Sequence, residues 1–298
     1  MNWKDEALKL SNEGHSGRKI AKMLGKGRTS VLQFLRKQAV KEEAPEISFP
    51  KVLFIDVELK PFLFQGWAMF DQNFGLEQIQ EDWSILSYSA KWLHSDEVIY
   101  SDVTEKTEDD LLYELHSLLN EAHFIVGHNA KRFDLPKIRA RMIARGLPPH
   151  SPVRVIDTLH IARQEFKFSS NKLAYLTQLL CKSHVKGGHE KFSGHKLWKE
   201  FLKGNPEAIT AMREYNMLDV TSLEELYFIL APWSSKLPMF EVYFDAEVDM
   251  SNWVKEGYCY TNFGKYEQFK NVSTGQYRRG RKNLLSKEKR SELLANIA

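Results

Sequence analysis

The sequence predicts an α/β protein in which a mixed sheet is flanked by helices, with a small helical domain before it and a small β module after it. Strand-like apolar runs come first in the central region, and helical runs alternate with strands later, an order typical of α/β domains. The 298 residues are 43% hydrophobic, which is enough for a sizeable core. Clusters of Lys and Arg mark both ends of the chain.

The charge is unevenly distributed along the chain. The net charge is +7 over residues 1–41, −9 over residues 42–277 and +5 over residues 278–298. Basic ends suit binding to a phosphate backbone, and an acidic middle suits a protein that holds divalent cations. Charge runs are also common on ordinary solvated surface, so charge alone leaves both interpretations open.

Membrane and secretory features are absent from the sequence. No stretch approaches the roughly 20 apolar residues that a membrane span needs. The N-terminus lacks the basic-then-apolar layout of a signal peptide. The two cysteines, Cys181 and Cys259, form no CxxC pair. We therefore expect an intracellular, cytoplasmic protein without membrane contact, with Cys181 as a core side chain.

Residues 4–38 have the pattern of three short helices. Gly14 ends the first helix, Ser16 can cap the second, and Gly25-Lys26-Gly27 makes a turn before the third begins at Thr29 or Ser30. The apolar face of the second helix is expected to comprise Ile20, Ala21, Met23 and Leu24. Two helices joined by a glycine-containing turn have the layout of a DNA-binding helix-turn-helix.

Residues 14–25 resemble the resolvase and transposase type of helix-turn-helix. The resemblance implies DNA contacts from the second and third helices. The candidates are Arg18, Lys19, Arg28, Thr29, Ser30 and Arg36. The alternative is a small basic helical bundle that docks on its own protein.

The central region predicts a series of strands and helices. The expected strands are 51–56, 67–74, 84–91, 98–100, 124–127 and 153–157. The expected helices are 108–121, 135–145, 158–164, 171–182, 194–203, 205–217 and 218–230. Together with the polar, proline-bearing linker 42–50, these limits give a helix-turn-helix domain at 1–41, an α/β domain at 51–235, a β module at 236–283 and a basic helix or tail at 284–298.

Acidic residues occur where strands end and on one helix face. Asp56 and Glu58 end the first strand with one residue between them, so both side chains project to the same side. Two adjacent carboxylates repel each other unless a cation lies between them. Asp134 stands at a strand-to-helix junction, and Tyr215 shares a helix face with Asp219. Singly, each of these features is more typical of ordinary surface.

Taken in order, these motifs resemble the DEDDy 3′→5′ exonucleases of the ribonuclease-H-like superfamily. Asp56-x-Glu58 follows a hydrophobic strand, Gly127-His128-Asn129 precedes Phe133-Asp134, and Tyr215-x-x-x-Asp219 comes last. The resemblance covers about residues 50–232, and segments 155–159 and 169–173 look like stand-alone bacterial and phage members. It implies the ribonuclease-H-like fold.

The resemblance also implies a mechanism in which the four carboxylates hold two Mg²⁺ or Mn²⁺ ions. Asp56 would contact both ions, Glu58 and Asp219 would complete one, and Asp134 would reach the other. Tyr215 would orient the attacking water, and the product would be a nucleoside 5′-monophosphate. Asn129 and His128 are candidate substrate contacts, although His128 is also a candidate brace for its loop. Leu59 stands where the family usually has a threonine near the nucleotide, which leaves substrate preference open.

Two segments near the end of the chain raise the question of zinc. His184, His189 and His195 have a spacing that fits no common zinc site, so we expect a loop near the substrate with Lys186 or Lys191 as phosphate contacts. Residues 240–283 resemble a zinc ribbon, but Asn271, Thr274 and residues 249–252 stand where the cysteines would be. We therefore expect a β module without zinc. Its aromatic residues either stack on single-stranded bases or form a small core. They are Tyr258, Tyr260, Tyr266, Phe269 and Tyr277.

The leading hypothesis from the sequence is a DNA exonuclease that acts on single strands or on 3′ ends of duplex. An RNA exonuclease is the alternative within enzymes, because this fold processes RNA as readily. A DNA-binding regulator that uses the nuclease fold as a scaffold is the alternative from another class. All four carboxylates are present, which favours an enzyme.

Overall fold

The structure, a computed structural model, describes residues 3–43, 50–67, 73–183, 192, 194–240 and 249–294. The chain divides into two compact units, one made by the N-terminal helices and the other by the central and C-terminal elements. Among the described residues, no helix is both long and apolar enough to cross a membrane. The segment with His184, His189, Lys186 and Lys191 lies outside the described residues, so the expectations placed on it stay predictions.

The N-terminal unit contains three helices, as expected. They are α1 (Trp3–Asn12), α2 (Gly17–Met23) and α3 (Arg28–Glu43). Ser16 caps α2 by accepting a hydrogen bond from the backbone N–H of Lys19. Ile20 and Ala21 are buried, but the expectation for Met23 is wrong, because its side chain is 54% exposed. This short helix buries only the face that Ile20 and Ala21 form.

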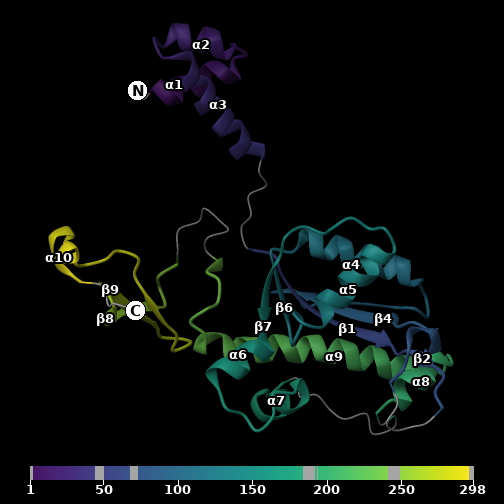
Figure 1. Ribbon diagram of the computed structural model, residues 1–298. Coiled ribbons are helices and arrows are strands. Elements are labelled where there is room, and N and C mark those ends of the chain that lie inside the picture. Colours follow the sequence, from purple (N-terminus) through teal and green to yellow (C-terminus); the bar gives the residue numbers. More distant parts are fainter. Residues whose placement is uncertain are drawn as a thin grey trace. The chain divides into compact units, whose positions relative to one another are not determined.

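The second unit is built on a five-stranded sheet with the order β5-β4-β1-β6-β7. Strand β1 pairs with β4 in antiparallel and with β6 in parallel orientation, and β7 is parallel to β6, so the predicted mixed sheet is confirmed (Figure 1). The strands are β1 (Val52–Lys60), β4 (Ser84–Trp92), β5 (Val98–Asp102), β6 (Phe124–Gly127) and β7 (Arg154–Asp157).

Helices cover both faces of this sheet. One face carries α4 (Glu108–Glu121) and α5 (Asp134–Ala144), and the long helix α9 (Pro206–Leu230) crosses the other (Figure 1). Helices α6 (Thr158–Glu165), α7 (Leu173–Leu180) and α8 (Lys196–Leu202) pack against α9. The division into helices 205–217 and 218–230 is wrong: residues 206–230 form one helix, because neither Gly nor Pro interrupts them after Pro206.

The segment between β1 and β4 differs from the expected strand 67–74. It holds a two-stranded pair, β2 (Leu63–Phe64) and β3 (Ile79–Glu81), and a short 3₁₀ helix, Leu76–Gln78. Of the expected strand, residues 67, 73 and 74 are described and lie outside any strand, whereas 68–72 lie outside the described part. Another 3₁₀ helix, Ala231–Trp233, follows α9.

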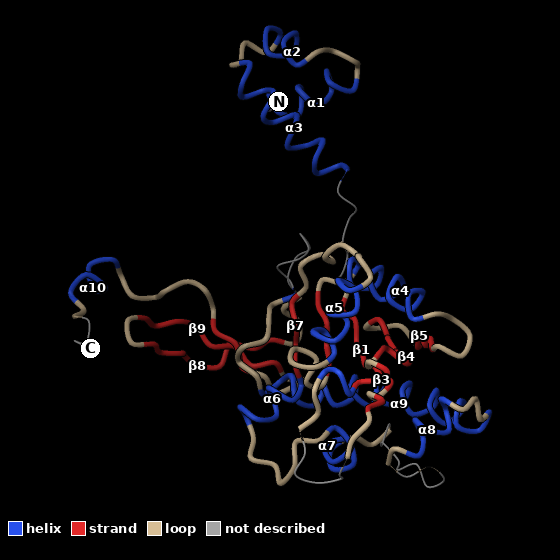
Figure 2. The backbone as a smooth tube through the Cα atoms, turned by 45° about the vertical axis from the view of Figure 1, so that its right-hand side comes forward, coloured by secondary structure: helices blue, strands red, loops and turns tan. Residues whose placement is uncertain are grey.

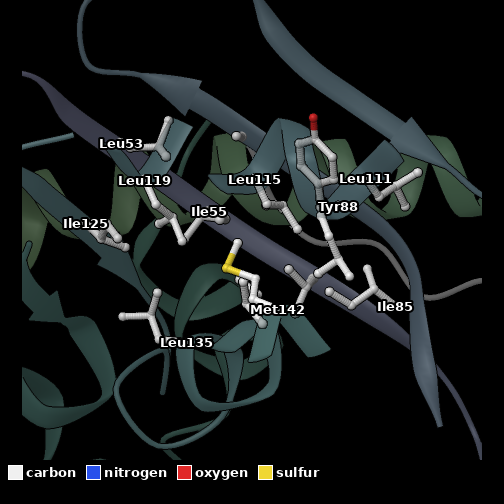
Figure 3. Close-up of a cluster of buried hydrophobic side chains, with 14 of the residues drawn as sticks. Leu53, Ile55, Ile85, Tyr88, Leu111, Leu115, Leu119, Ile125, Leu135 and Met142 are labelled. Atoms are coloured by element: carbon white, nitrogen blue, oxygen red, sulfur yellow. The ribbon is translucent and has the colours of Figure 1, made fainter. Parts of the chain in front are cut away.

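The alternation of side chains along β1 divides the two faces of the sheet. Leu53, Ile55 and Val57 enter a core with α4 and α5, part of which is drawn in Figure 3. Phe54 points to the opposite face, where its ring meets Tyr227 of α9 at a centroid distance of 5.7 Å. Asp56 and Glu58 have the same parity as Phe54, so they face α9.

A half-buried ion pair joins α4 to α5. Glu108 accepts hydrogen bonds from the guanidinium of Arg141 at 2.7 and 2.6 Å, and it also accepts the N–H of Ile85. Burial favours the neutral form of Glu108, but the bonds from Arg141, Ile85 and Arg145 outweigh burial and hold its pKa below the ordinary 4.5. The pair therefore stabilises the fold when Glu108 is charged.

Glu108→Gln is expected to lower the free energy of unfolding by about 2 kcal/mol, because Arg141 loses its charged partner in a partly buried position. Urea unfolding at pH 7 measures the loss. Since the folded-state pKa is depressed, the contribution is present above pH 4.5 and disappears as the pH falls through the lower folded-state value. The exposed pair Lys51–Glu121 supplies the control, and Glu121→Gln should cost less than about 0.5 kcal/mol. Equal effects would contradict the prediction.

The C-terminal residues form a small antiparallel sheet with the order β10-β9-β8, of which β8 and β9 are labelled in Figure 2. Its strands are β8 (Trp253–Thr261), β9 (Gly264–Asn271) and β10 (Tyr277–Arg279), and the short helix α10 (Lys287–Glu292) follows. This is the small β module expected from the sequence.

Candidate metal centre

Strand β1 delivers two carboxylates to the α9 face of the sheet. Asp56 and Glu58 are half-buried, while Val57 between them is buried in the core on the other side. Their partners on β4 are Ser89 and Ser87, which are small, polar and fully buried. The pairing register shifts between Glu58 and Leu59, so the strand changes its course directly after the second carboxylate.

Helix α9 brings a third carboxylate to this pair. Asp219 is buried, and one oxygen each from Asp56, Glu58 and Asp219 lie within 4.8 Å of one another. Three carboxylates this close repel unless a cation lies among them. Oxygen ligands on a partly enclosed surface suit Mg²⁺ or Mn²⁺. The residues present therefore fit a divalent metal site.

Asp134 lies beside this group rather than within it. It is the first residue of α5, and its Oδ1 accepts a hydrogen bond of 3.3 Å from the backbone N–H of Val57, between Asp56 and Glu58. Burial raises the pKa of Asp134 to about 7, and the charge of Asp157 adds to the shift, whereas backbone hydrogen bonds oppose it. The structure thus brings three predicted carboxylates together and places the fourth against the strand that carries two of them.

Tyr215 lies one turn before Asp219 on the same face of α9. Its pKa is raised far above the ordinary value, first by burial and then by the charges of Asp219, Glu58 and Asp56, with a hydrogen bond to Asp219. The phenol therefore keeps its proton at neutral pH and can donate a hydrogen bond. Trp198 of α8 meets the tyrosine ring edge-to-face at 6.1 Å.

The loop between β6 and α5 carries the two predicted substrate contacts. Asn129 has a left-handed backbone with φ of 75°, and its N–H donates to the carboxylate of Asp157 at 2.9 Å. His128 uses one ring nitrogen with the Thr158 hydroxyl and the other with the carbonyl of Asn171. These bonds favour the bracing role for His128, since both nitrogens are engaged by the protein. For Asn129 the hydrogen bond to Asp157 engages the backbone N–H, and its substrate contact stays a prediction.

Leu59 lies in the wall of a pocket next to the carboxylates. The pocket has a volume of about 280 Å³, and its other described lining residues are Pro61, Gly194, His195 and Trp198. Trp198 is the residue that also contacts Tyr215. Trp198 therefore links the pocket to Tyr215. Leu59 links it to the carboxylate cluster, because Leu59 directly follows Glu58 in the chain.

Asn216 is a site residue that the sequence motifs do not identify. Its side-chain Nδ2 donates to Oδ2 of Asp56 at 2.7 Å, and its Oδ1 accepts from the buried hydroxyl of Ser87 at 3.2 Å. The residue is fully buried. Its only sequence mark is its place between Tyr215 and Asp219, where an inward-facing polar residue is unexpected. The chain Ser87–Asn216–Asp56 holds one carboxylate oxygen in place.

Asn216→Ala is expected to weaken Mn²⁺ affinity about tenfold to a hundredfold, because the removed amide orients Asp56. Isothermal titration with Mn²⁺ measures the effect. Asn205→Ala is a matched control, since Asn205 caps the N-terminus of the same helix. It should cost about 1 kcal/mol of stability and leave Mn²⁺ affinity unchanged. An affinity in Asn216→Ala equal to that of the unaltered protein would refute the positioning role.

Comparison with known proteins gives a family assignment. A family model of the RNase H superfamily matches residues 77–231, just over half of the chain. The match contains Asp134, Tyr215 and Asp219, whereas Asp56 and Glu58 on β1 precede it. A search of curated proteins finds no match.

Solved structures also match, 135 chains in all. One is the family B DNA polymerase from the hyperthermophilic archaeon Pyrobaculum calidifontis, with 16% sequence identity and a TM-score of 0.44. The alignment covers 62% of this chain and 25% of the polymerase, so the chain spans about a quarter of that protein's length.

Proposed function

Because the chain belongs to the RNase H superfamily, we propose that it is a metal-dependent 3′→5′ exonuclease of the DEDDy type that shortens DNA. The observation that carries the proposal is the grouping of Asp56, Glu58 and Asp219, whose oxygens lie within 4.8 Å of one another. Asp134 is one hydrogen bond away from the same strand. Tyr215 adds a protonated phenol beside Asp219.

The roles proposed for the side chains are those that the resemblance to the DEDDy exonucleases implies. Two bound Mg²⁺ or Mn²⁺ ions would acidify the attacking water and stabilise the charge on the leaving 3′-oxygen. Asp56 would contact both ions, as the resemblance to the DEDDy exonucleases implies, and Asp134 would reach the second ion from its place against Val57. Tyr215 would orient the water by donating its proton in a hydrogen bond. Hydrolysis would release a nucleoside 5′-monophosphate.

Two further features would position the end of the strand. The pocket walled by Leu59 and Trp198 is of a size and polarity to receive one base. Asn129 would contact the nucleotide from the loop that leads to Asp134. His128 would act on the substrate indirectly, by bracing this loop. A zinc ion has no part in the proposal for the C-terminal module.

The choice of DNA as substrate rests on the N-terminal helices. Arg18 and Lys19 on α2 are exposed, as are Arg28, Thr29 and Ser30 at the start of α3. Exposed basic and hydroxyl side chains at the N-terminus of a third helix suit contact with DNA phosphates and bases. Arg36 stays a candidate from the sequence alone, because its side chain lies outside the described part. RNA stays the alternative substrate, and a regulator without activity the alternative function.

The test uses oligonucleotides labelled at the 5′ end. We expect stepwise shortening from the 3′ end with Mg²⁺ or Mn²⁺, none with EDTA, and none with Asp219→Ala. Single-stranded DNA, duplex DNA and RNA of the same sequence are compared. Tyr215→Phe should slow shortening while it retains Mn²⁺ binding. No metal-dependent product on any substrate, or equal activity in Asp219→Ala, would overturn the enzyme proposal.

Removal of residues 1–41 tests the DNA assignment separately. The shortened chain should cleave a short single strand at an unchanged rate, but bind duplex DNA more weakly and with less dependence on salt. Faster cleavage of RNA than of either DNA in the intact chain would replace the DNA proposal by the RNA alternative. Unchanged duplex binding would count against the helix-turn-helix assignment.

A further inference from the structure

The C-terminal sheet has a composition that its own folding does not explain. Residues 249–294 contain ten Lys or Arg and five Asp or Glu. Tyr258, Tyr260 and Tyr277 are 45%, 67% and 49% exposed, so they do not form a small core. Large exposed aromatic rings among cations have a cost in water and suggest that another molecule covers them.

The sheet forms one wall of a cleft of about 620 Å³, and residues 234–239, which follow α9, form another. Three arginines and two tyrosines line it, and the described lining residues include no Asp or Glu. These five residues are Arg278, Arg279, Arg281, Tyr266 and Tyr277. The acids on the neighbouring strands are engaged elsewhere, since Glu267 pairs with Lys255 and Glu256 with Lys270. The cleft therefore has a positive and aromatic surface.

Cations and rings in the cleft are already arranged against one another. The guanidinium of Arg279 lies 4.2 Å from the centre of the Tyr266 ring. Beside the cleft, the ammonium of Lys270, which is not one of the lining residues, lies 5.3 Å from the centre of the Tyr277 ring. Such contacts keep the charged groups near the rings with little loss of solvation. A ligand with alternating anionic and flat aromatic groups matches this pattern.

We propose that this cleft binds single-stranded nucleic acid, with Arg279 and Arg281 on its phosphates and Tyr277 stacked on a base. In a duplex the base faces are covered by their neighbours, so a stacking site selects a single strand. The identity of this strand as the substrate rests on the proposed function. Both the cleft residues and helix α9, which carries Asp219, fall in the second compact unit of the chain. The cleft and the carboxylates thus belong to the same unit.

The experiment measures binding without cleavage. Fluorescence anisotropy of a labelled 20-nucleotide oligothymidylate is titrated with the full chain in EDTA, at several salt concentrations. The double variant Arg279→Gln/Arg281→Gln is compared with Lys287→Gln/Arg290→Gln, which removes the same charge from α10 outside the cleft lining. Any binding by the N-terminal helices is common to all variants. Thermal melts confirm that each variant is folded.

The cleft variant should bind the oligonucleotide about tenfold more weakly, and its salt slope should fall by about 1.4, which is two phosphate contacts on a single strand. The α10 variant should bind like the unaltered chain. Tyr277→Ala should weaken binding about fivefold to a hundredfold, and Tyr277→Phe should not. With an abasic oligonucleotide of equal length, Tyr277→Ala should have no effect, because only the phosphates remain.

Equal binding by the cleft and α10 variants would overturn the inference. It would also be overturned if thymidine monophosphate displaced the labelled oligonucleotide at the same concentration as unlabelled oligonucleotide does. Equally strong binding of duplex through the same arginines would also overturn it. If the variants differ in binding as expected but the unaltered chain cleaves no strand, only the proposed function is refuted. If the unaltered chain cleaves a strand and the cleft variants bind the oligonucleotide as tightly as the unaltered chain does, only this inference is refuted.

Discussion

Asp56→Ala is expected to reduce metal-dependent shortening of a labelled strand by at least about 10³-fold, the scale of loss for residues that act as one unit with a bound metal. Asp56 is the residue that the structure connects to most of the site. It lies within 4.8 Å of both other clustered carboxylates and receives the amide of Asn216. Its removal would take away a proposed metal ligand, and Ser89, its partner on β4, is short and neutral.

Single-turnover kinetics with excess enzyme measure this loss without a contribution from product release. Glu214→Ala is the matched control, since Glu214 is exposed on α9 one residue before Tyr215. It should retain full activity. A thermal melt separates loss of chemistry from unfolding, because Asp56→Ala relieves carboxylate repulsion but also leaves the buried amide of Asn216 without its acceptor. A rate within tenfold of the unaltered enzyme would contradict the assignment of Asp56.

Mn²⁺ affinity is expected to weaken about tenfold for each pH unit below 7, because one proton must leave Asp134 when metal binds. The folded-state pKa of Asp134 is about 7, raised by burial and by the charge of Asp157 from the ordinary 3.8. Metal competes with this proton, so saturating Mn²⁺ should move the midpoint of titration to lower pH. Isothermal titration between pH 5.5 and 8 measures the dependence.

Without metal, the Asp134 carboxyl should lower the free energy of unfolding as the pH rises. Its effect on Mn²⁺ affinity has the opposite sign, since that affinity increases with pH. A carboxyl whose folded-state pKa is raised stabilises the folded chain most when it is protonated, so the free energy of unfolding in EDTA should fall as pH rises from 3.8 to about 7. Asp134→Asn should remove this fall and flatten the pH dependence of Mn²⁺ affinity. A slope in Asp134→Asn equal to that of the unaltered chain would assign the proton to another group.

Several helices and strands could be predicted because the local spacing of apolar residues is enough to identify them. The apolar spacing of residues 108–121 predicts a helix, and α4 has these bounds. The strands 84–91 and 124–127 were recognisable as apolar runs. The strand 67–74 was wrong where it is described, because an apolar, aromatic run does not reveal whether a neighbouring strand offers it a pairing edge. The sequence predicts two helices, 205–217 and 218–230, where the structure has the single helix α9.

The sequence predicts only some of the residues of the candidate site. The carboxylates and Tyr215 belong to ordered motifs, so the sequence alone identifies them as candidates. It does not identify Asn216 and Ser87, since a buried amide that holds Asp56 has meaning only when β4 and α9 meet β1. The pocket of Leu59 likewise needs Trp198 from a helix some 140 residues away in the chain.

The sequence by itself determined which side chains are available and on which face of β1 they lie. Alternation along an extended strand places Asp56 and Glu58 together on the side opposite Val57, whatever the rest of the chain does. Only the tertiary structure decided that this side faces α9, so that Asp219 comes within 4.8 Å of both. It also decided that Asp134 is buried against Val57, which raises its pKa to about 7. Strand alternation is a property of the local backbone, whereas burial and the approach of charges depend on how distant segments pack.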